Sequence, residues 1–438
     1  MSDVSTVIPS LPGFDAAVFA QAGAPGEPAL LAAKRAQAFA ATRTLAPPTA
    51  RDEEWRRTDP ERFPFAQFQR LPALPARPAG AADDWDDTFD VVVEISDTGY
   101  AISDRTGVVR DGKCAGFPLA EAADRFPAVI QDHLLGRAQP AQPRLLSMVS
   151  GAFWNVGFLV HVPAQVRIEK GILIRYDVQR SGGALLPRIL FVAEAGAEVS
   201  VVEHFTSAPD AEFLCLGGRE FYAGPGAKLK LVAVQEWGDR ALHLGEDWAR
   251  VEQDGRVDWV TLSLGGRASK LMVGSDVCAP RAHAQLSGVF FADRDQHFDQ
   301  RTLQLHTSPH TTSYLLYKGA VKDTGRSVYQ GVINAKPGAI DVDAYQMNNN
   351  LILNEGARAD SLPGLEIDAD DLKCSHGSTM GTLDPEQLFY LQSRGLPAAE
   401  ARRLVVAGFF EEVIAQIPHA FVQERLREHI QLKMGGGA

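Results

Sequence analysis

Length, composition and charge limit what this chain can be. Its 438 residues are too many for one compact core of ordinary size and predict two or three folding units or one elongated repeat structure. The content of 45% hydrophobic and 22% charged residues is typical of a folded protein. The net charge of -12, without a dense Lys/Arg block, argues against a nucleic acid or an anionic membrane as partner.

The chain also lacks the usual signals for export or membrane insertion. No basic start precedes an apolar run, and nowhere do about eighteen apolar residues follow one another. The cysteines are far apart and form no CxxC pair, so we expect reduced thiols rather than a disulfide framework or a zinc knuckle. They are Cys114, Cys215, Cys278 and Cys374. These features together favour a cytoplasmic protein without a membrane span.

Residues 1–88 are expected to form an N-terminal helical region and a linker. Helical periodicity after Pro28 ends at Pro47 and Pro48, and a second helix is expected between Thr49 and Pro60. A small helical cap that buries Trp55 and Phe63 explains these residues without a ligand. The Pro- and Ala-rich stretch 71–87 has the composition of a linker.

Residues 89–373 are expected to form a β-helix (β-solenoid) core. Short segments rich in Val, Ile, Phe, Tyr and Trp alternate with glycine turns, and no long amphipathic helix interrupts them after about residue 150. One turn pattern recurs at Gly196, Gly226, Gly255, Gly338 and Gly356, with first intervals of 30 and 29 residues. A near-regular period of strands favours a solenoid over a β-sandwich, because two-residue Asn-Gly and Asp-Gly hairpin turns are scarce.

Residues 374–438 are expected to form a C-terminal helical domain. Asp384 and Pro385 are typical of a helix start, and Gly395 is typical of a helix end. A longer helix between Pro397 and Pro418 carries a wide apolar arc, and another helix follows it. The predicted fold is therefore mainly β, with a β-helix core flanked by N-terminal and C-terminal α-helical domains.

Cys374 and His376 form the one closely spaced cysteine and histidine pair. Before them, Leu365 and Ile367 alternate with acidic residues, as in a half-buried strand. If a strand continues or resumes through Cys374, the thiol and the imidazole lie on the same face. Without further information, a buried thiol beside a hydrogen-bonded histidine is the more common explanation. Two ligands also cannot complete the four-coordinate shell that zinc or an iron-sulfur cluster prefers.

The region 345–417, with the motifs CSHG and LFYLQSRG, resembles the C-terminal half of the SufB/SufD family of iron-sulfur cluster assembly proteins. The resemblance implies a β-helix core between helical domains. It also implies that Cys374 and His376 help bind iron or a nascent cluster at an interface with a partner. The chain would then hold no tightly bound cofactor, only transient iron or an iron-sulfur cluster shared with that partner, and would have no catalytic residue of its own.

The same resemblance implies two partners. One is a SufB-like paralogue, which forms a heterodimer with the chain, while an isolated chain is expected to form a homodimer. The other is a SufC-like ABC ATPase, which docks on the C-terminal helices; packing between neighbouring helices explains their apolar arc equally well. The residues expected at this docking surface are Phe389, Tyr390, Phe409 and Phe410, with Arg394 and Glu411 at its rim. The chain has no P-loop, so it is not itself the ATPase.

Departures from the family pattern favour a SufD-like chain. SufB-type chains resemble this one but carry an additional cysteine after a QNW…TKR motif, and the corresponding stretch here has neither. A SufB-like scaffold remains the first alternative. A β-helix enzyme that acts on a metal or sugar, using acidic residues at 366–371, is less favoured, and a purely structural dimer should tolerate loss of Cys374 and His376. A cupin-like metal site at His297, His306 and His310 is disfavoured by their spacing, which predicts solvated turn histidines.

Overall fold

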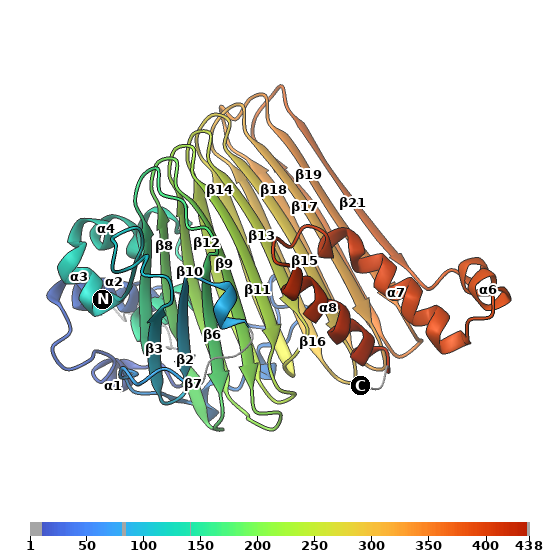
Figure 1. Cartoon of the computed structure of the whole chain (residues 1–438), viewed down its shortest axis with the longest axis horizontal. Helices are drawn as coiled ribbons and strands as arrows, with labels where there is room; N and C mark the ends of the chain where they lie inside the picture. Colours follow the sequence, from blue (N-terminus) through green and yellow to red (C-terminus); the bar gives the residue numbers. More distant parts are fainter. Residues whose placement is uncertain (1–10, 81–84, 141, 436–438) are drawn as a thin grey trace, which may run out of the picture.

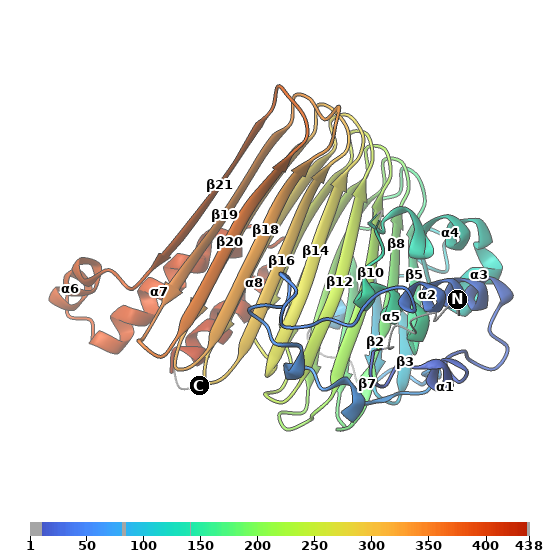
Figure 2. The same ribbon diagram turned by 180° about the vertical axis from the view of Figure 1, so that it is seen from behind.

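The computed structural model describes residues 11–80, 85–140 and 142–435, and its centre is a β-solenoid of two facing sheets (Figures 1 and 2). Sheet A has eleven strands in the described part of the chain: β1 Gln69–Arg70, β4 Ala115–Pro118, β5 Val156–Val162, β7 Gly183–Leu185, β8 Pro187–Ala193, β10 Leu214–Ala223, β12 Leu242–Val251, β14 Ala268–Val277, β16 His297–His306, β18 Arg326–Ala335 and β20 Arg358–Ile367. Sheet B has ten: β2 Val91–Ser96, β3 Gly99–Asp104, β6 Ile172–Val178, β9 Glu198–Ser207, β11 Lys228–Glu236, β13 Arg256–Ser263, β15 His283–Ala292, β17 Thr312–Val321, β19 Asp343–Ile352 and β21 Lys373–Gly381.

From β8 onward, successive strands alternate between the two sheets, and each strand pairs in parallel with the strand one coil away. In sheet B the register joins Glu198 to Lys228 and Lys228 to Arg256, which are 30 and 28 residues apart. Inward side chains therefore stack on inward side chains from coil to coil. The solenoid predicted from the glycine spacing is confirmed.

One corner of the solenoid is built from residues with positive φ. The N–H of Gly196 donates to the carbonyl of Pro225 one coil further on, and the N–H of Gly226 donates to that of Gln253, both at 2.8 Å. Glycine adopts this left-handed conformation without steric cost, and here φ is +68° at both positions. At Gly255 the prediction is off by one residue, because Asp254 has the positive φ. This corner ladder consists of Gln165, Gly196, Gly226, Asp254, Arg281, His310, Asp341 and Asp371.

The N-terminal region covers the outer face of sheet A. The first predicted helix is confirmed as α2, but the second is wrong: the chain around Trp55 forms turns and two short 3-10 helices. This segment is held to the sheet instead, because the Thr58 hydroxyl donates to Asp299 Oδ2 at 2.6 Å and Trp55 and Phe63 are buried, as predicted. The helices on this side are α1 Ala16–Phe19, α2 Ala29–Thr42, α3 Leu119–Arg125, α4 Pro127–Asp132 and α5 Leu145–Phe153, with short turns at η1 Pro60–Arg62, η2 Phe65–Gln67 and η4 His133–Arg137. The short turn η3 Asp86–Thr88 lies on the other side, where the preceding Trp85 stacks on His204 of sheet B.

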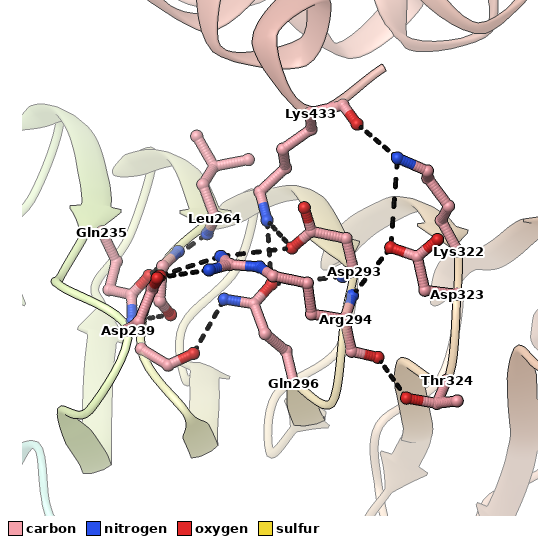
Figure 3. A network of polar contacts seen from close by, with 12 residues as sticks. Gln235, Asp239, Leu264, Asp293, Arg294, Gln296, Lys322, Asp323, Thr324 and Lys433 are labelled. Atoms are coloured by element: carbon pink, nitrogen blue, oxygen red, sulfur yellow. Dashed lines mark hydrogen bonds and ion pairs between the residues drawn. The ribbon is translucent and has the colours of Figure 1, made fainter. Parts of the chain in front are cut away.

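The C-terminal helices are α6 Pro385–Ser393, α7 Ala398–Ile414 and α8 Ala420–Lys433, of which α7 and α8 cover the outer face of sheet B (Figure 1). A polar network fastens the end of α8 to the solenoid (Figure 3). The buried Lys433 ammonium donates to Asp293 Oδ1 at 2.7 Å and to Gln296 Oε1 at 2.8 Å. Burial lowers the pKa of Lys433 to about 8. In contrast, α6 projects away from the solenoid (Figures 1 and 2).

The structure differs in two ways from the predicted division of the chain. The solenoid does not end at residue 373, because a strand resumes after the turn at 368–372 and continues to Gly381. Helices also occur within the predicted β core, where α3, α4 and α5 lie between β4 and β5 and contribute to the N-terminal cover. None of the helices in the described part of the chain has the length and apolar composition needed to span a membrane.

Candidate metal-binding site at the open end

The last coil of the solenoid is uncovered. Within the described residues, β20 pairs with β18 alone and β21 with β19 alone, so each presents an unpaired backbone edge. Leu365 and Ile367 occupy inward positions above the buried Ile333 and Ala335, yet they are 39% and 38% exposed. Their exposure follows from the missing next coil. Unpaired edges beside exposed apolar side chains are typical of surfaces that pair with another chain. We call this surface the open end.

The strand β21 places Cys374 and His376 on the same inward face of the open end. In the register with β19, Cys374 lies above Ala344 and His376 lies above Gln346. Ala344 and Gln346 are buried in the interior, so the two residues stacked on them also point toward the solenoid axis. Two residues along a strand separate their Cα atoms by about 6.6 Å. The predicted side-by-side placement is confirmed.

The Cys374 thiol is half-buried. It packs against a small apolar cluster that includes Ile333 and Val342. Burial, and then the negative charge of Asp343, raise the pKa of the Cys374 thiol. The sulfur is therefore protonated at neutral pH and would release its proton when a metal ion binds.

The His376 ring is exposed and makes no hydrogen bond within the described residues. Both ring nitrogens are thus available, one for a metal and the other for a hydrogen-bond acceptor. Nearby, the Ser378 hydroxyl donates to Ser361 Oγ at 2.8 Å and links the two terminal strands. This bond closes the last coil beside the pair.

The pair is an incomplete site. Among residues 11–80, 85–140 and 142–435, no three His, Cys, Asp or Glu side chains converge well enough to hold a metal ion. A thiolate and an imidazole together supply two of the four ligands that iron-sulfur clusters or zinc prefer. Because the pair lies beside an unpaired strand edge, a neighbouring chain can approach it.

The other histidine candidates do not form a site. His297 and His306 are fully buried, so the prediction of solvated turn histidines is wrong for both. They lie nine residues apart on β16 and point to opposite faces: His297 bonds to Thr58 on the outer side, and His306 to Ser313 in the interior. His310 is exposed in the corner ladder, where its ring bonds to Asp341 at 2.7 Å.

The remaining cysteines are protected. Cys114 and Cys215 are buried in the main apolar core, and burial raises the pKa of the Cys114 thiol to about 12. Cys278 is half-buried, its thiol donates to the Val251 carbonyl at 3.2 Å, and its pKa is also raised to about 12. The buried thiols of Cys114 and Cys215 are unreactive and the Cys278 thiol is bonded to a carbonyl, so Cys374, which has a histidine beside it, is the cysteine best placed for metal chemistry.

The predicted docking residues divide into exposed and buried ones. On α6, Phe389 is 74% and Tyr390 57% exposed, and the Arg394 guanidinium lies 5.2 Å from the Tyr390 ring centre. On α7, Phe409 is half-buried, whereas Phe410 is completely buried and packs against Phe291 of sheet B. We therefore remove Phe410 from the docking surface, since its ring serves the packing of α7.

Glu411, the last predicted rim residue, is exposed on α7. Its carboxylate pairs with Arg427 of α8 at 2.6 Å. It remains accessible to a partner, and it also links the two helices.

Sequence reasoning missed the polar interior beneath the pair. On β19 the inward positions are Gln346, Asn348 and Asn350, all of them buried. The motif NNN was visible in the sequence, but an alternating Gln-x-Asn-x-Asn row also fits the solvent face of a strand. The register was needed to assign it to the interior.

These features define a β-solenoid protein with a cysteine and histidine pair, a candidate for part of a metal site, at an open end. A family model described as the SUF system FeS cluster assembly, SufBD core domain, matches residues 176–409. The iron-sulfur cluster assembly SufBD family protein Rv1462 of Mycobacterium tuberculosis is 34% identical over 309 residues, which cover 68% of this chain and 76% of that protein. The chain therefore belongs to the SufBD family of iron-sulfur cluster assembly proteins.

Two further relatives are more distant. The iron-sulfur cluster assembly protein SufD of Escherichia coli is 29% identical over 243 residues, which cover 56% of this chain and 57% of that protein. Protein ABCI7, chloroplastic, of Arabidopsis thaliana is 27% identical over 295 residues, covering 64% and 62% of the two chains. The similarity to SufD agrees with the absence of the additional mid-solenoid cysteine.

Proposed function

We propose that this protein is the SufD-like subunit of a cytoplasmic SufB–SufC–SufD scaffold on which iron-sulfur clusters are assembled. The observation that carries the proposal is the position of Cys374 and His376 on the inward face of an unpaired terminal strand. Iron or a nascent cluster is cargo here rather than a resident cofactor. A site with few ligands suits cargo, because a cluster that is held weakly can be passed on.

The open end is the proposed contact with a SufB-like paralogue, or with a second copy when the chain is isolated. The unpaired edges of β20 and β21 can extend both sheets into a neighbouring chain, and Leu365, Ile367 and Met380 would be covered by it. The partner would supply the ligands that the pair lacks. The chain itself contributes binding groups and no catalytic residue.

Co-expression with a SufB-like paralogue tests the pairing. We expect Leu365→Asp to abolish co-purification, because it would bury an uncompensated carboxylate at the contact. Leu432→Asp on α8 is the matched control: Leu432 is equally apolar and 54% exposed, but it lies away from the open end. Loss of the complex in both variants, or in neither, would contradict this interface.

Iron in the purified complex tests the pair directly. Cys374→Ala and His376→Ala should each lower the bound iron and the cluster yield, whereas Cys278→Ala should leave both unchanged. Unchanged iron in the first two variants would remove both residues from the site.

The proposed surface for the SufC-like ABC ATPase is α6, together with Phe409 and Glu411 on α7. It exposes Phe389, Tyr390 and Arg394 on a helix that projects from the solenoid (Figure 1). Aromatic and arginine side chains are enriched in protein interfaces. Phe389→Ala should reduce co-purification of the ATPase at least tenfold, which corresponds to about 1.4 kcal/mol. Leu432→Ala should have no effect.

A further inference from the structure

A buried row of amides lies directly beneath the candidate metal ligands. Gln346, Asn348 and Asn350 on β19 point into the solenoid, and the register places them under His376, Ser378 and Met380 of β21. Neighbouring strands are about 4.8 Å apart. The coil beneath the open end therefore presents an amide, that of Gln346, directly under His376.

Gln346 is incompletely bonded within this row. Its Nε2 donates to the Gly331 carbonyl at 3.4 Å, while its Oε1 is buried and no described residue donates to it. This position of the Gln346 amide requires glycine at residue 331, since a Cβ there would lie 2.5 Å from the Gln346 oxygen. A buried carbonyl oxygen without a donor destabilises the fold. A donor from the coil above would remove that destabilisation.

The other polar groups near His376 are less suitable acceptors. The hydroxyls of Ser361 and Ser378 bond to each other. The Asn348 Oδ1 already accepts from Asn350 Nδ2 at 2.6 Å. The Asn350 Oδ1 also lacks a donor, but Asn350 lies four residues along the strand from Gln346, about 13 Å away.

We propose that Gln346 is a positioning residue for His376: its Oε1 accepts the N–H of one ring nitrogen while the other nitrogen binds iron. This inference rests on the proposed function of the pair. Histidines that bind metals usually donate their second N–H to a carbonyl or carboxylate, which fixes the tautomer and the ring orientation. The unpaired oxygen of Gln346 and the unpaired ring of His376 complement each other in this way.

Anaerobic titration of the purified complex with Fe(II) alone tests the inference. Gln346→Met keeps the side-chain length and removes the acceptor, so it should weaken Fe(II) binding about 10- to 100-fold. Gln346→Glu retains an acceptor and should bind Fe(II) at least as tightly as the natural chain. Gln304→Met is the matched control, because Gln304 is also a buried interior glutamine with an unbonded Oε1 but lies on β16.

A second readout separates positioning from packing. With histidine labelled with ¹⁵N and Zn(II) as a diamagnetic probe, His376 should show one tautomer in the natural chain and in Gln346→Glu, and a mixture in Gln346→Met. Equal Fe(II) affinities and equal tautomer ratios for Gln346→Met and Gln304→Met would overturn the inference and leave the pair as a site. Failure of the natural complex to bind Fe(II) would overturn the proposed function and the inference with it.

Discussion

The two ends of the solenoid are made of the same parallel strands but differ in what covers them. At the first end, β3 turns back antiparallel to β2, and Val108, Val109 and Cys114 pack across the interior, so Ile95 is 1% exposed. At the last end nothing in the described chain lies over β20 and β21, and Leu365 is 39% exposed. Both side chains occupy inward positions. Leu365 is therefore exposed because no further coil covers it, and not because the strand that carries it is polar.

Two cysteines show the chemical consequence. Cys114 is buried in the core at the first end, which we call the closed end. Cys374 at the open end is half-buried beside the exposed imidazole of His376. Desolvation raises the pKa of both thiols, and raises that of Cys114 to about 12. Only the open end leaves a thiol where a metal ion or a partner can reach it.

The largest expected effect compares inward aliphatic residues at the two ends. Ile95→Ala should lower the free energy of unfolding by about 2–5 kcal/mol, because it leaves a cavity in a packed core. Leu365→Ala should lower it by less than about 1 kcal/mol, because the side chain is already partly in water. Urea denaturation of the chain, diluted until it is monomeric and followed by circular dichroism, measures both values. Equal losses would mean that the last coil is covered within the monomer itself.

The second prediction concerns thiol reactivity. Iodoacetamide should modify Cys374 in the native monomer, at a dilution that prevents pairing, and reach Cys114 and Cys215 only after unfolding. Since the thiolate is the reactive form and the pKa of Cys374 is raised, its rate should increase about tenfold per pH unit between pH 6.5 and 8. Peptide mass spectrometry measures each site. Labelling of Cys114 at the rate of Cys374 would show that the closed end opens.

The smallest expected effect concerns the influence of Asp343 on the pKa of the Cys374 thiol. Asp343→Asn removes the negative charge that raises the pKa of Cys374, so the thiolate fraction at pH 7.5 should increase and alkylation should become a few-fold faster. Asp341→Asn is the control, since Asp341 pairs with His310 in the corner ladder. A rate unchanged by Asp343→Asn would leave burial as the sole cause of the raised pKa.

Much of the fold could be predicted because it depends on residues that are close together in the sequence. Gly196 and Gly226 marked the corner, Asp384 caps α6 through Glu386 N, and the cysteine and histidine spacing gave a shared face. The turn structure around Trp55 could not be predicted, because contacts with sheet A override the helical propensity of that segment.

The site was less predictable than the fold. The burial of His297, His306 and Phe410 depends on contacts between segments far apart in the sequence. The amide row beneath His376 depends on strand register, which a one-residue slip would reverse. A pair of ligands could be found from spacing, but the groups that orient them could not.

The corner ladder keeps the coils in register, so the length of the solenoid depends on the number of its coils. Each coil adds about 4.8 Å along the axis, so the span between the N-terminal cover and Cys374 takes discrete values set by the number of coils. Insertion or deletion of one whole coil would shift that span by a single step and preserve the stacking. A change of a few residues is accommodated in the turns, since the coils between ladder positions already vary from 27 residues (254 to 281) to 31 (310 to 341), and leaves the span unchanged. Relatives that present their ligands at the same height to a shared partner should therefore keep the number of coils and differ in length in their turns.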